Sequence, residues 1–207
     1  MSKLRVAVLL SGSGTSLENL FEHIETGRLD AQVTLVVASR ASAGGLARAQ
    51  RRGVPAFAVP RRDHPDVTRF NDEIHGLLDR HEVDLVALLG FLSPFQTRRR
   101  WSGRVINVHP ALIPAFCGQG FYGRKVHEAV LEAGVKVTGA TVHFADDNYD
   151  RGPIILQEAV PVLDDDTPDT LAARVQAAER RLVPEAIRLI AEGRITVEGR
   201  RVRIKPA

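Results

Sequence analysis

The sequence has little cysteine, few aromatic residues and no long apolar segment. Its single cysteine, Cys117, excludes an intrachain disulfide framework and any zinc site built from several cysteines. The apolar run at the start of the chain ends before Ser11 and is too short for a signal sequence. No later run reaches the ~18 apolar residues that span a membrane. These features predict a soluble, cytoplasmic protein with no membrane partner.

The sequence also lacks a strong excess of one charge. It has 28 basic and 25 acidic residues, a net charge of +3. Three charges spread over a whole domain attract nucleic acid only weakly, so we expect no nucleic-acid partner. Because 44% of the 207 residues are hydrophobic and 26% are charged, the chain can bury one large core and is not expected to be disordered.

Apolar runs alternate with helical patterns through the first half of the chain. The patterns predict strands at 4–10, 33–38, 56–59 and 83–89, with helices at 16–26, 45–52 and 66–80 between them. An alternation of this kind predicts an α/β fold with an open, mostly parallel, doubly wound sheet of the Rossmann-like type.

The second half has a different pattern. We predict a strand at 104–108, a long irregular loop, a helix at 126–133 with His127 on its exposed face, and two antiparallel strands at 135–144 and 154–162. The last helix begins near Thr167 and extends to about 191, and Pro184 is expected to kink or break it. The tail at 195–204 predicts a terminal hairpin with its turn at 198–199.

The first candidate motif is the glycine-rich segment SGSGTS at 11–16, between the first predicted strand and helix. Glycines allow a ligand to approach the backbone closely, and a helix N-terminus offers free N–H groups to an anion. No Gly-Lys-Ser/Thr follows, and Leu17 occupies the third glycine position of a dinucleotide fingerprint, so neither of those motifs is present. The segment indicates phosphate binding, or else only a tight turn with a serine cap.

The second candidate motif is NVHP at 107–110, at the end of a predicted strand. The strand period places Asn107 and His109 on one face, roughly 6–7 Å apart. Pro110 then ends the strand at the edge where open α/β sheets bind ligands. An amide that can stabilise an oxyanion and an imidazole that can move a proton suit acyl transfer, although such a pair can also be structural.

The third candidate motif is the segment 139–155, in which a strand leads into an acidic loop with Asp150. A carboxylate from this loop can hold His109 and raise its pKa. The alternative is a solvated acidic turn. His109, His143 and these acids do not have the spacing of a metal site.

Together the three motifs resemble the glycinamide ribonucleotide formyltransferases, a branch of the folate-dependent formyltransferases. The resemblance extends over essentially the whole chain, and the segment 139–155 matches the family signature over seventeen positions. It implies transfer of the formyl group of 10-formyltetrahydrofolate to the amine of 5'-phosphoribosylglycinamide in purine biosynthesis. The products would be N-formylglycinamide ribonucleotide and tetrahydrofolate. It further implies one domain at 1–207, with a phosphate-binding half at 1–102 and a catalytic, folate-binding half at 103–207.

The resemblance also implies a role for individual residues. His109 would be the general acid/base, Asn107 would polarise the formyl carbonyl, and Asp150 would orient His109 and raise its pKa. The ribose phosphate and ribose of the substrate would contact Gly14, Thr15, Ser16, Gln176 and Glu179. The folate would contact Leu92, Ser93, Phe95, Asn107, Thr141 and Asp146. The stretch 92–96 is shorter than in familiar bacterial members, and the loop 116–125 is more glycine-rich.

The co-substrate implied is 10-formyltetrahydrofolate, with no metal. The partners implied are small-molecule substrates, and the protein is expected to be a monomer or a weak homodimer. One alternative is another enzyme that uses 10-formyltetrahydrofolate, either a hydrolase or one with a different formyl acceptor. A second alternative is a nucleotide-sensing module without turnover.

Overall fold

The computed structural model describes residues 3–206. The chain folds into two compact units. The first unit ends at Ile106 and the second begins at Asn107. Strand β5 (Val105–His109) begins in the first unit and delivers its last three residues to the second.

The first unit is an α/β layer structure with the predicted order of elements. Strands β1 and β2 and strands β2 and β3 are parallel neighbours, and β4 pairs with the other side of β1 in parallel. Its elements are β1 (Leu4–Leu10), α1 (Thr15–Glu25), β2 (Ala31–Ala38), α2 (Gly44–Arg51), β3 (Ala56–Ala58), η1 (Arg61–Asp63), α3 (Val67–Arg80), β4 (Leu85–Leu88) and α4 (Arg98–Trp101).

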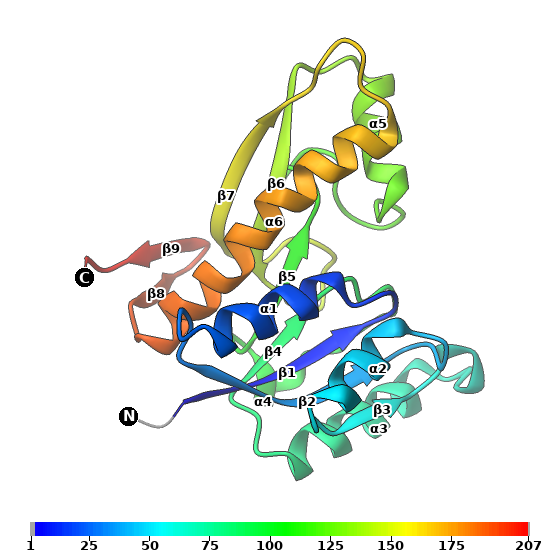
Figure 1. Ribbon diagram of the computed structural model, residues 1–207, viewed down its shortest axis with the longest axis vertical. Coiled ribbons are helices and arrows are strands. Elements are labelled where there is room, and N and C mark those ends of the chain that lie inside the picture. The colour runs from blue at the N-terminus through cyan, green and yellow to red at the C-terminus, as the bar shows by residue number, and fades with distance from the viewer. Residues whose placement is uncertain (1–2, 207) are drawn as a thin grey trace. The chain divides into compact units, whose positions relative to one another are not determined.

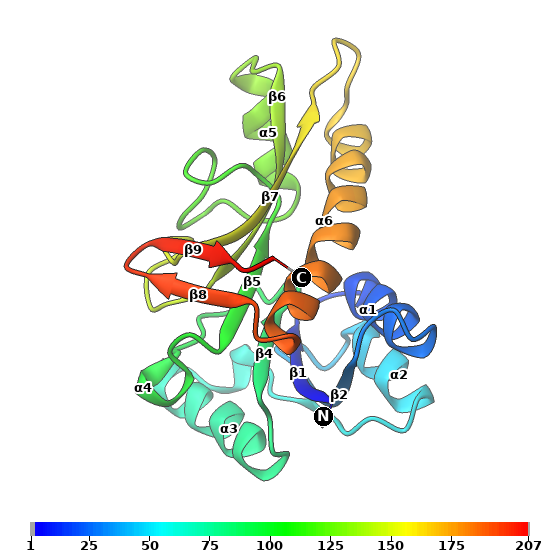
Figure 2. The ribbon, with the colours of Figure 1, turned by 90° about the vertical axis from the view of Figure 1, so that its left-hand side faces the viewer.

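Helices cover both faces of these four strands, as the near-continuous apolar runs predict. Figure 2 shows α1 and α2 on one face and α3 on the other. The strand order reverses between β1 and β4, because β2 and β3 extend the sheet to one side of β1 and β4 lies on the other. Ligands of doubly wound sheets bind beyond the carboxyl ends of the strands at such a reversal.

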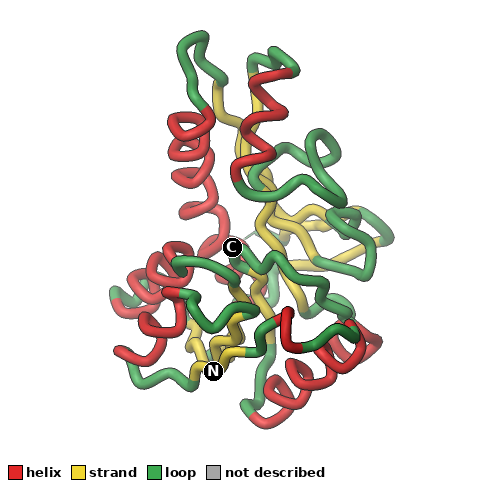
Figure 3. The backbone as a smooth tube through the Cα atoms, turned by 90° about the vertical axis from the view of Figure 1, so that its right-hand side faces the viewer, coloured by secondary structure: helices red, strands yellow, loops and turns green. Residues whose placement is uncertain are grey.

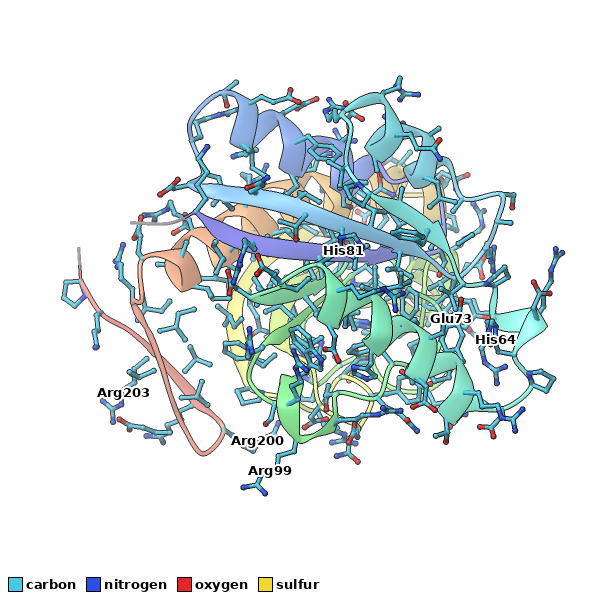
Figure 4. All side chains as sticks on the ribbon, turned by 90° about the horizontal axis from the view of Figure 1, so that it is seen from below. His64, Glu73, His81, Arg99, Arg200 and Arg203 are labelled. Carbon is cyan, nitrogen blue, oxygen red and sulfur yellow. The ribbon has the colours of Figure 1, made fainter. Side chains whose placement is uncertain are left out.

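Helix α3 is fastened at its N-terminal end. The Asp66 side chain caps the helix by accepting hydrogen bonds from the N–H groups of Thr68 and Arg69. His64 points toward Glu73 in Figure 4, with 2.6 Å between Nε2 and the carboxylate, while its Nδ1 bonds to the Pro60 carbonyl. These bonds tie the turn before α3 to the helix itself.

The second unit is built on the antiparallel pair β6 and β7, with α6 packed against both strands (Figure 1). Helix α5 packs on α6. At Gly139, an added Cβ would lie 2.0 Å from the Glu158 carbonyl oxygen, so the pairing needs glycine there. Besides the end of β5, the unit contains α5 (Arg124–Glu132), β6 (Val137–Phe144), β7 (Ile154–Pro161), α6 (Pro168–Ala191), β8 (Ile195–Glu198) and β9 (Arg201–Ile204).

Helix α6 begins at the predicted position, where Thr167 and Thr170 form a capping box. Of the kink or break expected at Pro184, the break is absent, because the helix continues through Pro184 to Ala191. The terminal hairpin is confirmed, with Ile195 opposite Ile204, but its turn is at 199–200, one residue later than predicted, because Glu198 still pairs with Arg201. None of the helices within residues 3–206 has the length and apolarity needed to cross a membrane. The predicted fold class is confirmed.

Candidate active site

The end of β5 carries the predicted amide and imidazole. Asn107 is half-buried and His109 is only 4% exposed, so both side chains lie in a place with little water. His109 Nε2 donates a hydrogen bond of 2.8 Å to the Phe116 carbonyl in the loop that follows β5, drawn in green in Figure 3. The other ring nitrogen, Nδ1, lies 3.6 Å from Asp150 Oδ2. The strand and two loops therefore meet at His109.

Asp150 reaches this place from the turn between β6 and β7. Its φ of 55° is in the left-handed region, which a residue with a side chain adopts only when its surroundings hold it there. Gly152 makes the turn possible, because an added Cβ would lie 1.8 Å from the Phe144 carbonyl oxygen. Asp150 Oδ2 also accepts a hydrogen bond of 2.9 Å from the Gly118 N–H.

Asn107 lies between the carboxylate and a second imidazole. Its Nδ2 is 3.3 Å from Asp150 Oδ1 and 3.2 Å from His143 Nε2. His143 Nδ1 is 2.9 Å from the Phe144 carbonyl, which can only accept, so Nδ1 donates there, and His143 Nε2 also lies 3.5 Å from Asp150 Oδ1. Both Asn107 contacts are long for hydrogen bonds, and a stronger acceptor can therefore compete for an N–H.

The pKa values of His109 and Asp150 reflect opposing effects. Burial lowers the pKa of His109, and the nearby charge of Asp150 and the bond to Phe116 offset only part of this, so the net direction is downward. This differs from the expected rise. Burial raises the pKa of Asp150, but His143, His109 and the Gly118 N–H together hold it below its ordinary value. Asp150 is therefore an anion beside a neutral imidazole.

Thr141 lies close by but has no room for a ligand. It is fully buried, and its hydroxyl donates to the Ala111 carbonyl at 2.7 Å while accepting from the Ile113 N–H and from Gln157 Nε2. Thr141 therefore holds the start of the loop after β5 against β6 and β7. Asp146 is exposed, and its carboxylate accepts from the Asn148 N–H in the acidic turn.

The glycine-rich turn lies in the first unit, at the strand-order reversal. Gly14 precedes α1 with φ 75°, and an added Cβ would lie 2.6 Å from the Gly45 Cα. Since glycine has no side chain to cap the helix, the N–H groups of its first turn at Thr15 and Ser16 remain available to an anion. Arg48 Nε donates to the Ser13 carbonyl at 2.9 Å and so holds the turn in shape.

The predicted folate-contacting segment also lies at this reversal. Leu92 follows β4 and is 49% exposed, while Ser93 and Phe95 are half-buried. The Leu92 N–H donates to Ser11 Oγ at 2.8 Å, which links the segment to the start of the glycine-rich turn.

The two predicted ribose contacts are one turn apart on α6. Gln176 is exposed and Glu179 is half-buried. Residues spaced by three lie on the same side of a helix. Burial raises the pKa of Glu179 to about 7, so its carboxyl is partly protonated at neutral pH and can both donate to and accept from a hydroxyl.

Sequence reasoning missed the importance of two histidines. The contact of His143 with Asn107 places His143 in the site. His127 was expected on the exposed face of its helix, but it is only 4% exposed, and its Nδ1 has no hydrogen-bond partner within residues 3–206. Burial lowers the pKa of His127, and the nearby His109 lowers it further. The available signal was the pair of apolar residues Val126 and Val130 on either side of it, because the apolar stripe of a helix is at least ~100° wide.

Within residues 3–206, no three or more His, Cys, Asp or Glu side chains are grouped so that they could hold a metal ion. The Cys117 thiol donates a hydrogen bond to the Pro114 carbonyl. Burial raises the pKa of the thiol, so Cys117 is a poor nucleophile.

Comparison with known proteins identifies relatives along nearly the whole chain. The formyl transferase family model matches residues 4–187. A trifunctional purine biosynthetic protein adenosine-3 from Gallus gallus is 40% identical over 200 residues, which are 95% of this chain and 19% of that protein. The chain thus spans about a fifth of the length of that curated relative.

Solved structures agree with the sequence comparison. Glycinamide ribonucleotide transformylase 1 from Symbiobacterium toebii is 44% identical, with a TM-score of 0.90 over 99% of this chain and 95% of that one. A formyltetrahydrofolate deformylase from Pseudomonas syringae has a TM-score of 0.88 over 99% of this chain and 66% of that one, but only 24% identity, so the likeness concerns the fold.

Proposed function

The chain belongs to the formyl transferase family, and on that premise we propose that it transfers the formyl group of 10-formyltetrahydrofolate to the amine of 5'-phosphoribosylglycinamide. The products are N-formylglycinamide ribonucleotide and tetrahydrofolate, and the reaction is a step of purine biosynthesis. The observation that carries the proposal is the cluster of an amide, an imidazole and a carboxylate at Asn107, His109 and Asp150, in which Asp150 lies 3.3 Å from Asn107 and 3.6 Å from His109.

The reaction forms one C–N bond and breaks another. The amine nitrogen attacks the formyl carbon, and the carbonyl oxygen takes up negative charge in the tetrahedral intermediate. Collapse of this intermediate expels N10 of the folate. The proton lost by the attacking amine balances the proton gained by N10, so the protein needs only to move a proton and to stabilise an oxyanion.

His109 and Asn107 supply both needs. A buried donor aimed at a developing oxyanion contributes roughly 2.7–4 kcal/mol. The Asn107 N–H groups make only long bonds in the free protein and can turn to the formyl oxygen. Burial keeps His109 neutral, and the negative charge that develops on the substrate, added to that of Asp150, favours its protonation as the reaction proceeds.

Other residues bind and orient the two substrates. We assign the phosphate to the backbone of Gly14, Thr15 and Ser16, and the ribose hydroxyls to Gln176 and Glu179. We assign the folate to Leu92, Ser93 and Phe95, together with the backbone around Asp146. Thr141 contributes through the loop that it holds. We further propose that the protein acts in the cytoplasm, as a monomer or weak homodimer, on small molecules and without a metal, a nucleic acid or a membrane surface.

The test is turnover of 10-formyltetrahydrofolate, followed by absorbance with and without glycinamide ribonucleotide. We expect tetrahydrofolate release that requires the ribonucleotide, and a loss of at least about 10²-fold in His109→Ala, the lower range for a general acid/base. His81→Ala, which changes a histidine at the end of α3, serves as the matched control and should retain activity. Release without ribonucleotide would identify a hydrolase. Nucleotide binding without any release would identify a sensing module.

A further inference from the structure

The segment between β4 and α4 is held by side chains at both of its ends. At the first end, the Leu92 N–H donates to Ser11 Oγ, and Ser11 Oγ is 2.6 Å from Ser39 Oγ. Both serines are buried, with 3% and 4% exposure. The backbone at Ser11 is also bonded to the segment, through its N–H and the Gly90 carbonyl at 3.0 Å. The segment therefore leaves β4 in a defined direction.

At the other end, two polar side chains of α3 hold the segment. Asn71 Oδ1 accepts from the Gln96 N–H at 2.8 Å, and Asn71 Nδ2 is 3.3 Å from the Pro94 carbonyl. His75 lies one helical turn further on, and its Nε2 donates to the Gln96 carbonyl at 2.8 Å. Asn71 is fully buried and His75 is 7% exposed. Side chains of α3 thus replace the backbone partners that an irregular segment lacks.

Apolar contacts extend this arrangement along the helix. The Phe91 ring stacks on Phe70 with 6.2 Å between ring centroids, and the Phe95 ring lies 5.3 Å from the His75 imidazole. Burial lowers the pKa of His75, so its ring stays neutral and retains one N–H for Gln96. Leu92 is left exposed on a segment whose backbone is fixed on either side of it.

We propose that Asn71 and His75 are positioning residues for the reduced folate, because they hold the segment 92–97 in the form that receives it. This inference rests on the proposed function, which assigns the folate to Leu92, Ser93 and Phe95. A segment fixed before the ligand arrives loses less conformational entropy on binding, and its exposed apolar side chain is already in place. The short length of the segment makes it dependent on α3, since few of its backbone groups can pair within it.

The experiment compares three variants of the full chain. His75→Ala removes the bond to Gln96. Asn71→Ala removes the bonds to Gln96 and Pro94, and also the bond of Nδ2 to the Val67 carbonyl within α3. His75→Gln is the conservative variant, because its amide can still donate to the Gln96 carbonyl. Val33→Ala in β2 is the control for stability, as it creates a cavity at a buried side chain without altering a hydrogen bond.

We expect His75→Ala and Asn71→Ala to raise KM for 10-formyltetrahydrofolate about tenfold, the equivalent of one lost hydrogen bond, with kcat and KM for the ribonucleotide near the parent values. His75→Gln should recover most of this loss, and Val33→Ala should lose stability without a change in KM. Hydrogen exchange should show faster exchange of the Gln96 amide in Asn71→Ala than in the parent.

Direct binding of 10-formyltetrahydrofolate separates this inference from the proposed function. If the parent binds the folate but does not transfer its formyl group, the proposed function fails, and weaker binding by the two alanine variants still supports the positioning role. Equal folate affinity in the parent and both alanine variants, or an equal rise in Val33→Ala, would overturn the inference. It is also overturned if the parent does not bind the folate.

Discussion

His109 shows how one residue can be subject to two opposing influences. Burial favours the neutral imidazole, while the Asp150 carboxylate 3.6 Å away favours the imidazolium. The balance is on the neutral side in the free protein, so a proton added during the reaction is weakly held and easily given up. A group with this property is well suited to pass a proton from an amine to N10.

Asp150→Asn tests this balance. The change removes the charge that favours protonated His109, so the pKa of His109 should fall further and turnover should drop by about 10²–10³-fold, as for the loss of one oxyanion donor. The measurement is kcat and KM from tetrahydrofolate release. KM for the ribonucleotide should stay near the parent value, because its phosphate is assigned to other residues. Unchanged turnover would show that Asp150 has no part in the reaction.

At the scale of elements, the β6–β7 turn brings Asp150 to the site. The turn depends on Gly152, which packs against the Phe144 carbonyl where a side chain has no space. Helix α3 has the opposite property at Gly76, where an added Cβ would meet only the far end of the Arg80 side chain, at 3.5 Å. The two glycines therefore allow a matched comparison.

Gly152→Ala should destabilise the protein by about 1–3 kcal/mol, because the turn must shift to accept a methyl group, and it should also lower turnover by displacing Asp150. Gly76→Ala should stabilise it by about 0.5–1 kcal/mol, because alanine loses less backbone entropy in a helix. Urea unfolding of both variants measures the difference. Equal effects of the two substitutions would refute this account of the turn.

At the scale of the whole molecule, buried histidines control the response to acid. Burial lowers the pKa of His75, His109 and His127 below their ordinary value of 6.5. Below pH 6.5 the unfolded chain therefore binds more protons at these sites than the folded protein does, and stability falls as the pH falls. Glu179 acts in the opposite direction between 4.5 and about 7, since its carboxyl binds a proton more tightly when folded.

We expect the midpoint temperature of thermal unfolding to decrease as the pH is lowered from about 7 to about 5. Below its ordinary pKa, each buried histidine lowers the free energy of unfolding by up to about 1.4 kcal/mol per pH unit. Calorimetry across this range provides the measurement. Glu179→Gln removes the opposing group, so its stability should depend more steeply on pH than that of the parent. A midpoint that is independent of pH in both proteins would contradict the prediction.

Local sequence patterns were sufficient to predict the secondary-structure elements and to find the motifs. Hydrophobic period and turn residues are properties of neighbouring positions, so the strands, the helices other than α4, the Gly14 turn and the terminal hairpin were predicted close to their observed bounds. Of the kink or break expected at Pro184, a break was wrong, because packing of α6 on β6 and β7 outweighs one lost helix bond. The family resemblance, carried by the same motifs, is confirmed by the comparisons.

The sequence by itself determined the fold class, the family and the residue types at 107, 109 and 150. Only the tertiary structure decided which groups surround them: that His127 is buried, that His143 bonds to Asn107, and that Thr141 holds a loop. It also decided the direction of the His109 pKa. The burial of an atom and the charges around it depend on segments that are far apart in the chain, so the spacing of neighbouring residues does not predict them.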